Sequence, residues 1–568
     1  MHRERVVERR QPTTFALAVA TGLLLLFAFQ ASVAALRDSV TVDEFVHLPM
    51  GLYMLLHRDF HLDVVHGTLS RMIPALPLWV GGTYIAERPD LTHWALAFHF
   101  LAEHPDEYPK LFLLPRAVVI VEALLLGALL YRWASVLYGD AAGACALILF
   151  AFSPTFLAHG HLVTTDLPAT LALVFAAYAG WRFVDDPSTR RAGVLGAVLG
   201  VAPALKLTVL PVEAAIFFLI VVTLRRRNAT TAANRNRVWI QLFGAVVVAV
   251  AVVNLCYGCQ GTLSRVADLN LDPQGKIAWL AARFPSLRLP VPAPLLVGLD
   301  EPAARAQTPD PESYLAGQWS RQGWWYYHLV AFALKTPLPM VIWALVAVLG
   351  WLAGRAAKGT VFVVVPAIAV FATNALFNPI DIGVRHVMAA EAYLIVAASP
   401  WIVRGWRGSS VEASSSRGTR QWIRMATALS ILWYAAGTLE VAPRYLEYFN
   451  EAAGGPSRGH RWLIDSNLDW GQDLVRLADY LNDHHLESVP LAYFGSVNPI
   501  VYGVHFQPLD PATAHGITVI SASLLMGQSY FAWHGPHELA WSGFGQYDWL
   551  RRLEPIDRVG SMFVFDLP

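Results

Sequence analysis

Charged side chains are scarce in this 568-residue chain. Asp, Glu, Lys and Arg together make up 15% of it, against about 25% in an average soluble domain. The formal net charge is +0, so no overall field favours nucleic acid as a partner. Three cysteines, Cys145, Cys256 and Cys259, cannot build a disulfide framework. These absences argue against a soluble globular protein, a nucleic-acid-binding protein and a disulfide-stapled scaffold.

Apolar residues are abundant instead, at 55% of the chain with a mean hydropathy of +0.43. Runs of about 20 apolar residues recur, each long enough to cross a hydrocarbon core of roughly 30 Å. The fold class predicted is a polytopic α-helical membrane protein with about 11 transmembrane helices and a small C-terminal α/β extracytoplasmic domain. The predicted spans are 13–36, 111–131, 140–158, 166–183, 192–205, 207–224, 238–257, 328–353, 359–376, 387–403 and 422–441.

The orientation follows from the cations in the short connections, which concentrate on the cytoplasmic side of membrane proteins. A cytoplasmic N-terminus places every short basic connection inside, and the C-terminus then lies outside a bacterial plasma membrane. The cations concerned are Arg3, Arg5, Arg9, Arg10, Arg132, Arg190, Arg191, Arg225, Arg226, Arg227, Arg235, Arg237, Arg355, Lys358, Arg404, Arg407, Arg417 and Arg420. Segment 72–85 is short and proline-broken, which favours an interfacial or re-entrant piece. The run 192–224 holds two helices that break near Pro203 to Lys206.

Two domains are expected. Residues 1–441 form the transmembrane domain, with outward loops at 37–110 and 258–327, and residues 442–568 form the C-terminal domain. In the latter, apolar spacing predicts a helix over 469–484 and strands at 490–494, 516–521 and 561–566. The cytoplasmic connections, such as the flexible 408–418, are too short for a nucleotide-binding domain, and no GxxxxGK[ST] motif occurs. An activated substrate would therefore arrive on a lipid carrier.

Asp43 and Glu44 directly follow the first span. They are either solvated loop residues or the start of an interfacial helix whose stripe is Phe45, Leu48, Leu52 and Leu55. The helix dipole favours negative charge at that position. A carboxylate fixed at head-group depth is well placed to act as a general base toward a lipid-borne donor.

Other ionisable residues stand at the predicted outer ends of spans. His57 and His61 have the i, i+4 spacing of metal ligands, but nothing completes a ligand set, and His66 is better explained as a phosphate or hydroxyl contact. Asp166 is either a helix cap or a second acidic site residue. Lys206, Lys335 and Arg385 either extend to the surface or together hold a phosphate.

The tail carries a dense polar cluster, DSNLDWGQD, that begins at Asp465. Asn467, Asp469 and Trp470 are either helix caps with a tryptophan anchor or acceptor-binding residues, because indole faces stack on sugars and amides bind hydroxyls.

These residues fall in segments that resemble bacterial members of the protein O-mannosyltransferase-like, or GT-C, superfamily of lipid-linked-sugar glycosyltransferases. The segments are VDEFVHLPMGLYML, HGHLVTTDLPATLALVFAAY, LKLTVLP, SYLAGQWSRQGWWYYHLVAFALKTPLP, IDIGVRHVMAAEAYL and YFNEAAGGPSRGHRWLIDSNLDWGQDL, with the ending VGSMFVFDL. Two departures occur. His66-Gly67-Thr68-Leu69 stands where relatives often have HPPL, and Met388-Ala389-Ala390 replaces the usual LLP.

The resemblance implies a transferase that takes a sugar from a polyprenyl-phosphate carrier, with inversion, and passes it to a protein, lipid or glycan acceptor. Asp43 would be the base or acceptor-orienting residue, with Glu44 beside it. Substrate contacts are expected from His66, Asp166, Lys206, Lys335, Arg385 and His386. Membrane lipids are the other expected partners. No metal ligand is predicted, and a divalent-cation requirement is left open.

Two other classes remain as alternatives: a transporter or flippase of lipid-linked or polar substrates, and a catalytically inactive envelope-assembly subunit. Transporters tend to have repeated halves and ionisable residues at mid-membrane. Here no internal repeat is visible, and the ionisable residues cluster at outer span ends, which favours surface chemistry.

Overall fold

The computed structural model describes residues 14–226, 232–273, 275–300, 313–377, 381–408, 417–535 and 538–568. Two predicted spans are broken: 140–158 ends in a separate short helix, α8 (Pro154–His159), and 328–353 begins with one, α16 (Tyr327–Lys335). Each of the eleven spans contains one main helix, so the polytopic helical fold is confirmed. These helices are α1 (Thr14–Arg37), α6 (Leu113–Tyr138), α7 (Asp140–Ala151), α9 (Asp166–Asp185), α10 (Thr189–Leu205), α11 (Leu210–Arg226), α12 (Ala232–Cys256), α17 (Leu338–Leu352), α18 (Val361–Phe377), α19 (Met388–Arg407) and α20 (Arg417–Glu440). The predicted cations Arg3, Arg5, Arg9, Arg10 and Arg227, and most of the linker 408–418, lie outside the described residues.

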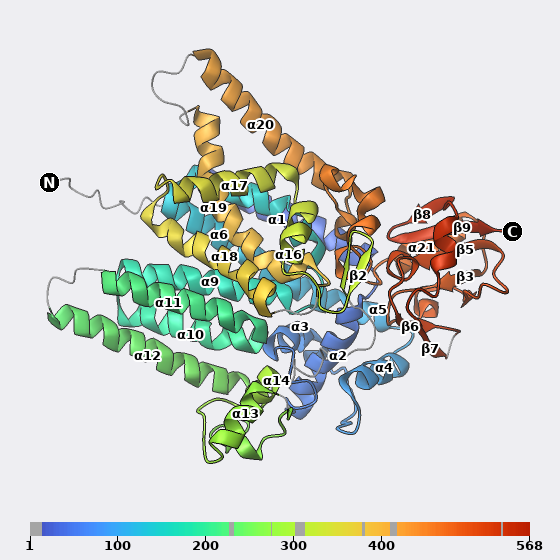
Figure 1. The fold of residues 1–568 in the computed structure, drawn as a ribbon, viewed down its shortest axis with the longest axis horizontal. Coiled ribbons are helices and arrows are strands. Elements are labelled where there is room, and N and C mark those ends of the chain that lie inside the picture. The colour runs from blue at the N-terminus through green and yellow to red at the C-terminus, as the bar shows by residue number, and fades with distance from the viewer. Residues whose placement is uncertain are drawn as a thin grey trace.

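Seven segments of the described chain are helical, long and apolar enough to cross a membrane by length and composition. The other predicted spans fall on shorter or more polar helices. α7 and α17 have 12 and 15 residues, α10 has 17, and α20 carries Arg417, Arg420 and Arg424 in its first half. α19 lies at the centre of the bundle, packed against α7, α9, α17 and α18 (Figure 1).

The segment 37–110, which the sequence predicts to be the first outward loop, folds into α2 (Val42–His57), α3 (Leu69–Val80), α4 (His93–Glu103) and α5 (Tyr108–Leu111). The expectation of a single apolar stripe on α2 is wrong, because α3 and α4 pack against the helix and bury most of it, with Phe45, Leu48 and Leu52 completely buried. Gly51 permits this close packing, since a Cβ there would lie 2.1 Å from the carbonyl oxygen of Arg71. Segment 72–85 therefore serves, in its helical part, as the cover of α2.

The predicted break near Pro203 to Lys206 is confirmed. α10 ends at Leu205, Lys206 is extended, and a 3₁₀ turn, η1 (Leu207–Val209), leads into α11. The backbone of Lys206 pairs with that of His66. A Cβ at Gly67 would lie 2.1 Å from the carbonyl oxygen of Leu205, so glycine at this position lets the first outward loop contact the break directly.

The C-terminal domain is a small α/β unit (Figure 1). Its sheet has the order β4-β3-β5-β9-β8, formed by β4 (Phe506–Pro508), β3 (Val489–Ala492), β5 (Gly516–Ser521), β9 (Met562–Leu567) and β8 (Asp557–Val559). β3 runs parallel to β4 and β5, while β9 is antiparallel to β5 and β8. The three predicted strands match β3, β5 and β9. A β6 (Tyr530–Trp533) and β7 (Leu539–Ser542) hairpin stands beside the sheet.

The predicted helix 469–484 begins later, as α21 (Leu474–Asp483), so neither Asn467 nor Asp469 caps it. Gly471 has a φ of +85°, which interrupts a helix before Leu474. The first amide of α21, that of Leu474, donates to Ser39 Oγ across 3.0 Å. Leu474, Leu477 and Leu481 pack on the sheet as the apolar spacing predicted. The helix is therefore capped by the first outward loop and not by its own flanking sequence.

Candidate functional site

Arg385 joins two carboxylates that are far apart in the sequence. Its Nη1 donates to Asp43 Oδ2 across 2.6 Å and to Asp166 Oδ2 across 3.2 Å. Lys206 Nζ donates to the other oxygen of Asp166. The structure thus brings together four of the residues singled out from the sequence, and we call them the Arg385 cluster: Asp43, Asp166, Lys206 and Arg385.

Each member stands at the end of a helix. Asp43 is in the first turn of α2, Asp166 opens α9, Lys206 follows α10, and Arg385 belongs to a 3₁₀ turn, η4 (Val384–Val387), before α19. Helix ends are where backbone groups lack intrahelical partners and where charged side chains find polar company. The cluster is therefore a convergence of four helix ends from four separate segments.

The four side chains of the Arg385 cluster differ in their exposure to solvent. The side chains of Asp43 and Lys206 are 23% and 18% exposed, whereas those of Arg385 and Asp166 are 7% and 2% exposed. Burial alone would raise the pKa of Asp43, but Arg385 and His47 more than offset it and hold that pKa below its usual range. Asp43 therefore presents an ionised carboxylate at the open edge of the cluster.

His66 lies at the same edge, 30% exposed, and is positioned by residues that the sequence analysis did not select. Its Nδ1 is 2.9 Å from Asp63 Oδ2, and Asp63 is held by the buried Arg71 at 2.8 Å. Arg71 also donates to the carbonyl oxygens of His66 and Gly67. Asp63 thus fixes the ring through Nδ1 and leaves Nε2 directed to other partners. The i, i+3 spacing of Asp63 and His66 was a signal that could have identified this pair.

His47 is a second residue that the sequence analysis missed. It follows Asp43 by one helical turn, with Nε2 3.8 Å from Asp43 Oδ2, and its ring meets that of His66 edge to face at 4.9 Å. Burial lowers the pKa of His47 to about 4, so the imidazole is neutral at physiological pH. Asp43 and His66 are therefore linked through an uncharged ring.

Glu44 lies beneath Asp43 and not at the open edge. It is completely buried, and both oxygens accept from Arg116, at 2.9 and 2.6 Å. Oε1 also accepts from the amide of Val163, and Oε2 from the amide of Thr41. Its hydrogen-bonding positions are occupied by the protein itself.

Lys335 lies outside the Arg385 cluster, whereas His386 lies within electrostatic range of Asp166, Lys206 and Arg385. Lys335 Nζ donates to the carbonyl oxygens of Leu446 (2.7 Å) and Asn467 (2.5 Å) and lies 4.3 Å from the centre of the Phe449 ring. It ties α16 (Tyr327–Lys335) to the tail. His386 follows Arg385, with its ring centroid 5.6 Å from that of His328.

The tail residues proposed as acceptor contacts make internal bonds. Asn467 accepts from the amide of Val384 and donates to the hydroxyl of Tyr327. Asp469 accepts from the amide of Ser523 and the hydroxyl of Ser561. Trp470 is buried, and its ring lies 4.4 Å from the guanidinium carbon of Arg385. Of the two interpretations left open by the sequence, these contacts favour the tryptophan anchor, without the helix capping.

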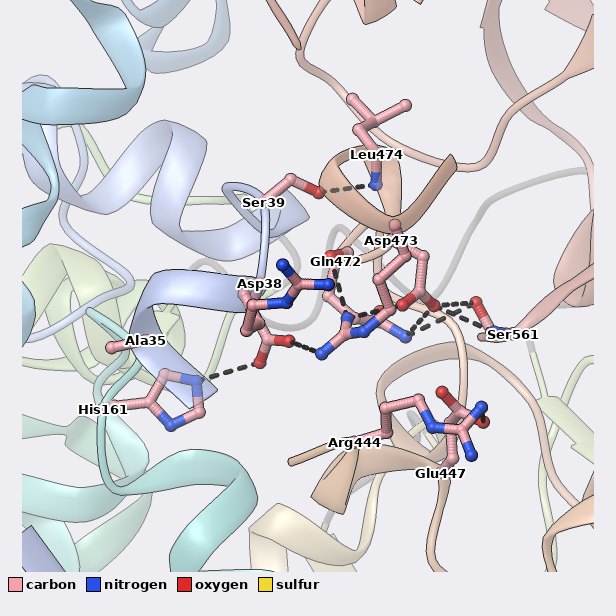
Figure 2. Close-up of polar contacts among 12 residues, drawn as sticks. Ala35, Asp38, Ser39, His161, Arg444, Glu447, Gln472, Asp473, Leu474 and Ser561 are labelled. Carbon is pink, nitrogen blue, oxygen red and sulfur yellow. Dashed lines mark hydrogen bonds and ion pairs between the residues drawn. The ribbon is translucent and has the colours of Figure 1, made fainter. Parts of the chain in front are cut away.

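A second buried charge network binds the tail to the end of α1. Asp38 lies 3.0 Å from His161 Nε2 and accepts from Arg476 across 2.7 Å, and Arg476 also pairs with Asp473 at 2.6 Å. Figure 2 shows Asp38 between His161 and the Gln472–Asp473 segment, with Ser561 beyond. This network holds the outward turn that precedes Asp166 in register with the tail.

The buried carboxyl of Asp469 predicts a pH-dependent stability. Burial, with a contribution from nearby Asp473, raises its pKa to about 7. The folded state therefore holds a proton that the unfolded chain has lost, and stability falls as pH rises from about 4 to about 7 and then levels off. We expect the thermal midpoint of the protein in micelles to fall between about pH 5 and 7, with a smaller slope in Asp469→Asn. An equal slope in the two proteins would contradict this.

No group of three or more His, Cys, Asp or Glu side chains within the described ranges is arranged to hold a metal ion. The divalent cation left open by the sequence stays untested.

Comparison with known proteins gives one match of a family model to part of the chain. The family model of dolichyl-phosphate-mannose-protein mannosyltransferases matches residues 113–257. This match supports, for that part of the chain, the resemblance predicted from the sequence. No curated protein matches the chain.

Among solved structures, the chain is similar to ArnT from Cupriavidus metallidurans bound to undecaprenyl phosphate, at 12% identity, 98% coverage of each chain and a TM-score of 0.46. The apo state of the same ArnT matches at 13% identity, 96% and 98% coverage and a TM-score of 0.45. The Archaeoglobus fulgidus oligosaccharyltransferase, in a complex with Zn and sulfate, matches at 11% identity, covering 92% of this chain and 73% of that one, with a TM-score of 0.44.

Proposed function

We propose that this protein transfers a sugar from a polyprenyl-phosphate carrier to an extracytoplasmic acceptor, and that the Arg385 cluster is its catalytic centre. The observation that carries the proposal is the position of Arg385, whose guanidinium is held between Asp43 and Asp166 directly below a partly exposed edge. A buried cation fixed by two carboxylates, with an ammonium beside it, can bind a phosphate without losing its place.

The chemistry needs a nucleophile and a stabilised leaving group. In our proposal an acceptor hydroxyl attacks the anomeric carbon, the bond from that carbon to the phosphate oxygen breaks, and the polyprenyl phosphate leaves with the bonding electrons. The hydroxyl proton passes to Asp43, which the structure leaves ionised at the open edge. Attack opposite to the leaving phosphate inverts the anomeric centre.

The leaving phosphate would bind the open side of Lys206 and His66. Lys206 keeps part of its side chain exposed although it also pairs with Asp166. His66 is oriented by Asp63 and contributes a ring nitrogen at the same edge. A phosphate leaving group needs no proton, so cations suffice and a second carboxylic acid, as in glycoside hydrolysis, is unnecessary.

We assign positioning roles to the remaining predicted residues. Glu44, locked by Arg116, fixes the first turn of α2 and so the place of Asp43. Lys335 and Asn467 fix the tail against η4 and so the place of Arg385. Under this proposal the predicted orientation places the whole cluster on the extracytoplasmic face, where a lipid-linked sugar is available and nucleotide sugars are not.

Asp43→Asn is expected to lower sugar transfer by about 10²- to 10⁴-fold, the range typical of losing a general base. The assay measures the product formed from synthetic polyprenyl-phosphate hexoses and pentoses by purified protein in liposomes, with envelope extract as the acceptor. Asp90→Asn is the matched control, since Asp90 lies in the same outward loop, is exposed and pairs with the neighbouring Arg88. Transfer by Asp43→Asn at the wild-type rate would remove Asp43 from the mechanism.

A further inference from the structure

Asp465 is a residue of the tail in an unusual backbone conformation. Its φ is +56°, in the left-handed region that residues other than glycine rarely adopt. Three backbone contacts hold it there. Its amide donates to Ser523 Oγ (3.2 Å), and its carbonyl oxygen accepts from the amides of Leu468 and Asp469 (2.8 and 2.9 Å). The surrounding structure thus imposes this conformation and fixes the direction of the side chain.

The carboxylate of Asp465 has only neutral partners in direct contact. It accepts from the amide of Ser466 (2.6 Å) and from Gln528 Nε2 (2.7 Å). Within the described part of the chain no lysine or arginine forms an ion pair with it, unlike Asp43 and Asp166. Burial raises its pKa, and Asp43 adds to the effect while Arg385 opposes it. The side chain remains partly exposed.

This carboxylate lies within electrostatic range of the Arg385 cluster, because the charges of Arg385 and Asp43 both act on it. The next residue, Ser466, accepts from Arg385 Nε across 3.1 Å, so Asp465 lies one residue from a direct contact of the cluster. Tyr530 completes the arrangement, because its hydroxyl lies 2.9 Å from Ser496 Oγ and its ring packs on Phe494 at 4.4 Å. Tyr530 experiences the charges of both Asp465 and Asp43, which places it within electrostatic range of the first outward loop and of the tail.

We propose that Asp465, Gln528 and Tyr530 form the subsite that binds the hydroxyl-bearing acceptor opposite Asp43. All three side chains are partly exposed. An ionised carboxylate accepts a hydroxyl proton in a hydrogen bond, an amide bonds hydroxyls in either sense, and a tyrosine offers an apolar face with a hydroxyl at its edge. This combination fits a neutral polyhydroxylated acceptor, a glycan or a glycosylated lipid. The inference rests on the proposed function.

The subsite does not include Asn467, Asp469 and Trp470, because these side chains are engaged in contacts within the protein. Asn467 and Trp470 contact η4, and Asp469 accepts from Ser523 and Ser561 of the C-terminal domain, so the segment that begins at Asp465 joins that domain to the cluster. In the segment 465–470, Asn467, Asp469 and Trp470 thus anchor the chain, and Asp465 at its start is the residue proposed to contact the acceptor.

The test separates acceptor binding from donor chemistry. With synthetic polyprenyl-phosphate sugars as donor and diluted envelope extract as acceptor, Asp465→Asn is expected to raise the apparent acceptor KM about tenfold or more, in line with the loss of a charge-assisted hydrogen bond. Donor KM, and donor hydrolysis by water without acceptor, should stay within about twofold of wild type. Tyr530→Phe should raise the acceptor KM by a smaller factor.

Asp510→Asn is the matched control, because Asp510 is an exposed aspartate of the same domain that contacts only its own loop. An unchanged acceptor KM in Asp465→Asn would overturn the subsite, as would a loss of donor hydrolysis equal to the loss of transfer. If wild-type protein neither hydrolyses nor transfers any donor, the proposed function fails, and the subsite fails with it. Wild-type turnover with an unaltered Asp465→Asn leaves the function standing and removes the subsite alone.

Discussion

Arg385→Gln is expected to reduce sugar transfer on the order of 10²- to 10³-fold, because it removes the cation that holds both Asp43 and Asp166. Removing one partner of a buried, hydrogen-bonded charge pair costs about 2–5 kcal/mol or more, and much of that is the penalty of the charge left behind. Asp166 would keep Lys206, but Asp43 would lose the arginine with which it pairs in the described part of the chain. The measurement is the rate of transfer in liposomes at saturating donor.

Arg385→Lys distinguishes charge from geometry. A lysine supplies one point charge and cannot reproduce the guanidinium, which bonds Asp43 and Asp166 through Nη1 and Ser466 through Nε. We expect a loss of transfer smaller than that of Arg385→Gln. Arg37→Gln is the control, since Arg37 is half exposed and pairs with the equally exposed Asp479. Full activity in a correctly folded Arg385→Gln protein would exclude Arg385 from the catalytic centre.

Arg116→Met is expected to have the largest effect on stability, about 3–5 kcal/mol. Arg116 donates to both oxygens of Glu44 and to the carbonyl oxygens of Ala35, Asp38 and Ser39. All these acceptors surround the end of α1 and the start of α2, so methionine leaves a buried carboxylate and three carbonyls without this donor. The thermal midpoint in micelles, compared with Arg132→Met at an exposed site of the same helix, measures the loss.

Glu44→Gln tests whether Glu44 positions Asp43 or takes part in catalysis. If Glu44 positions Asp43, as we propose, the thermal midpoint should fall, and the residual activity of the folded fraction should recover at lower temperature. A catalytic Glu44 would instead show a loss of kcat with an unchanged midpoint.

The span positions follow from the sequence because local apolar length determines them, and the break at Lys206 follows from a charge within an apolar run. The two errors in the fold have a common physical cause. The apolar stripe of α2 shows that the helix is buried on that side, but not that α3 and α4 cover the rest of it. The start of α21 depends on Ser39, which is 435 residues away.

The candidate site was accessible to sequence reasoning in part. The predicted orientation put Asp43, Asp166 and Arg385 on one face, and the structure places them in contact across as many as 342 residues of sequence. The sequence does not reveal which charged side chains have their hydrogen-bonding positions occupied by other residues of the protein. In the sequence, Glu44 and Lys335 are charged residues near the ends of predicted spans, as Asp43 and Lys206 are. Only tertiary packing distinguishes the two pairs.

The central claim is that this protein breaks and forms a glycosidic bond and does not merely move its substrate. The direct measurement uses liposomes that contain the purified protein, with a labelled polyprenyl-phosphate sugar as donor and envelope extract as acceptor, followed by separation of intact donor, free polyprenyl phosphate and glycosylated product. We predict that polyprenyl phosphate and product appear together, with an inverted anomeric centre, and that the rate of product formation falls about 10²- to 10⁴-fold with Asp43→Asn. Intact donor that crosses the bilayer without any release of polyprenyl phosphate would contradict the account and favour a flippase.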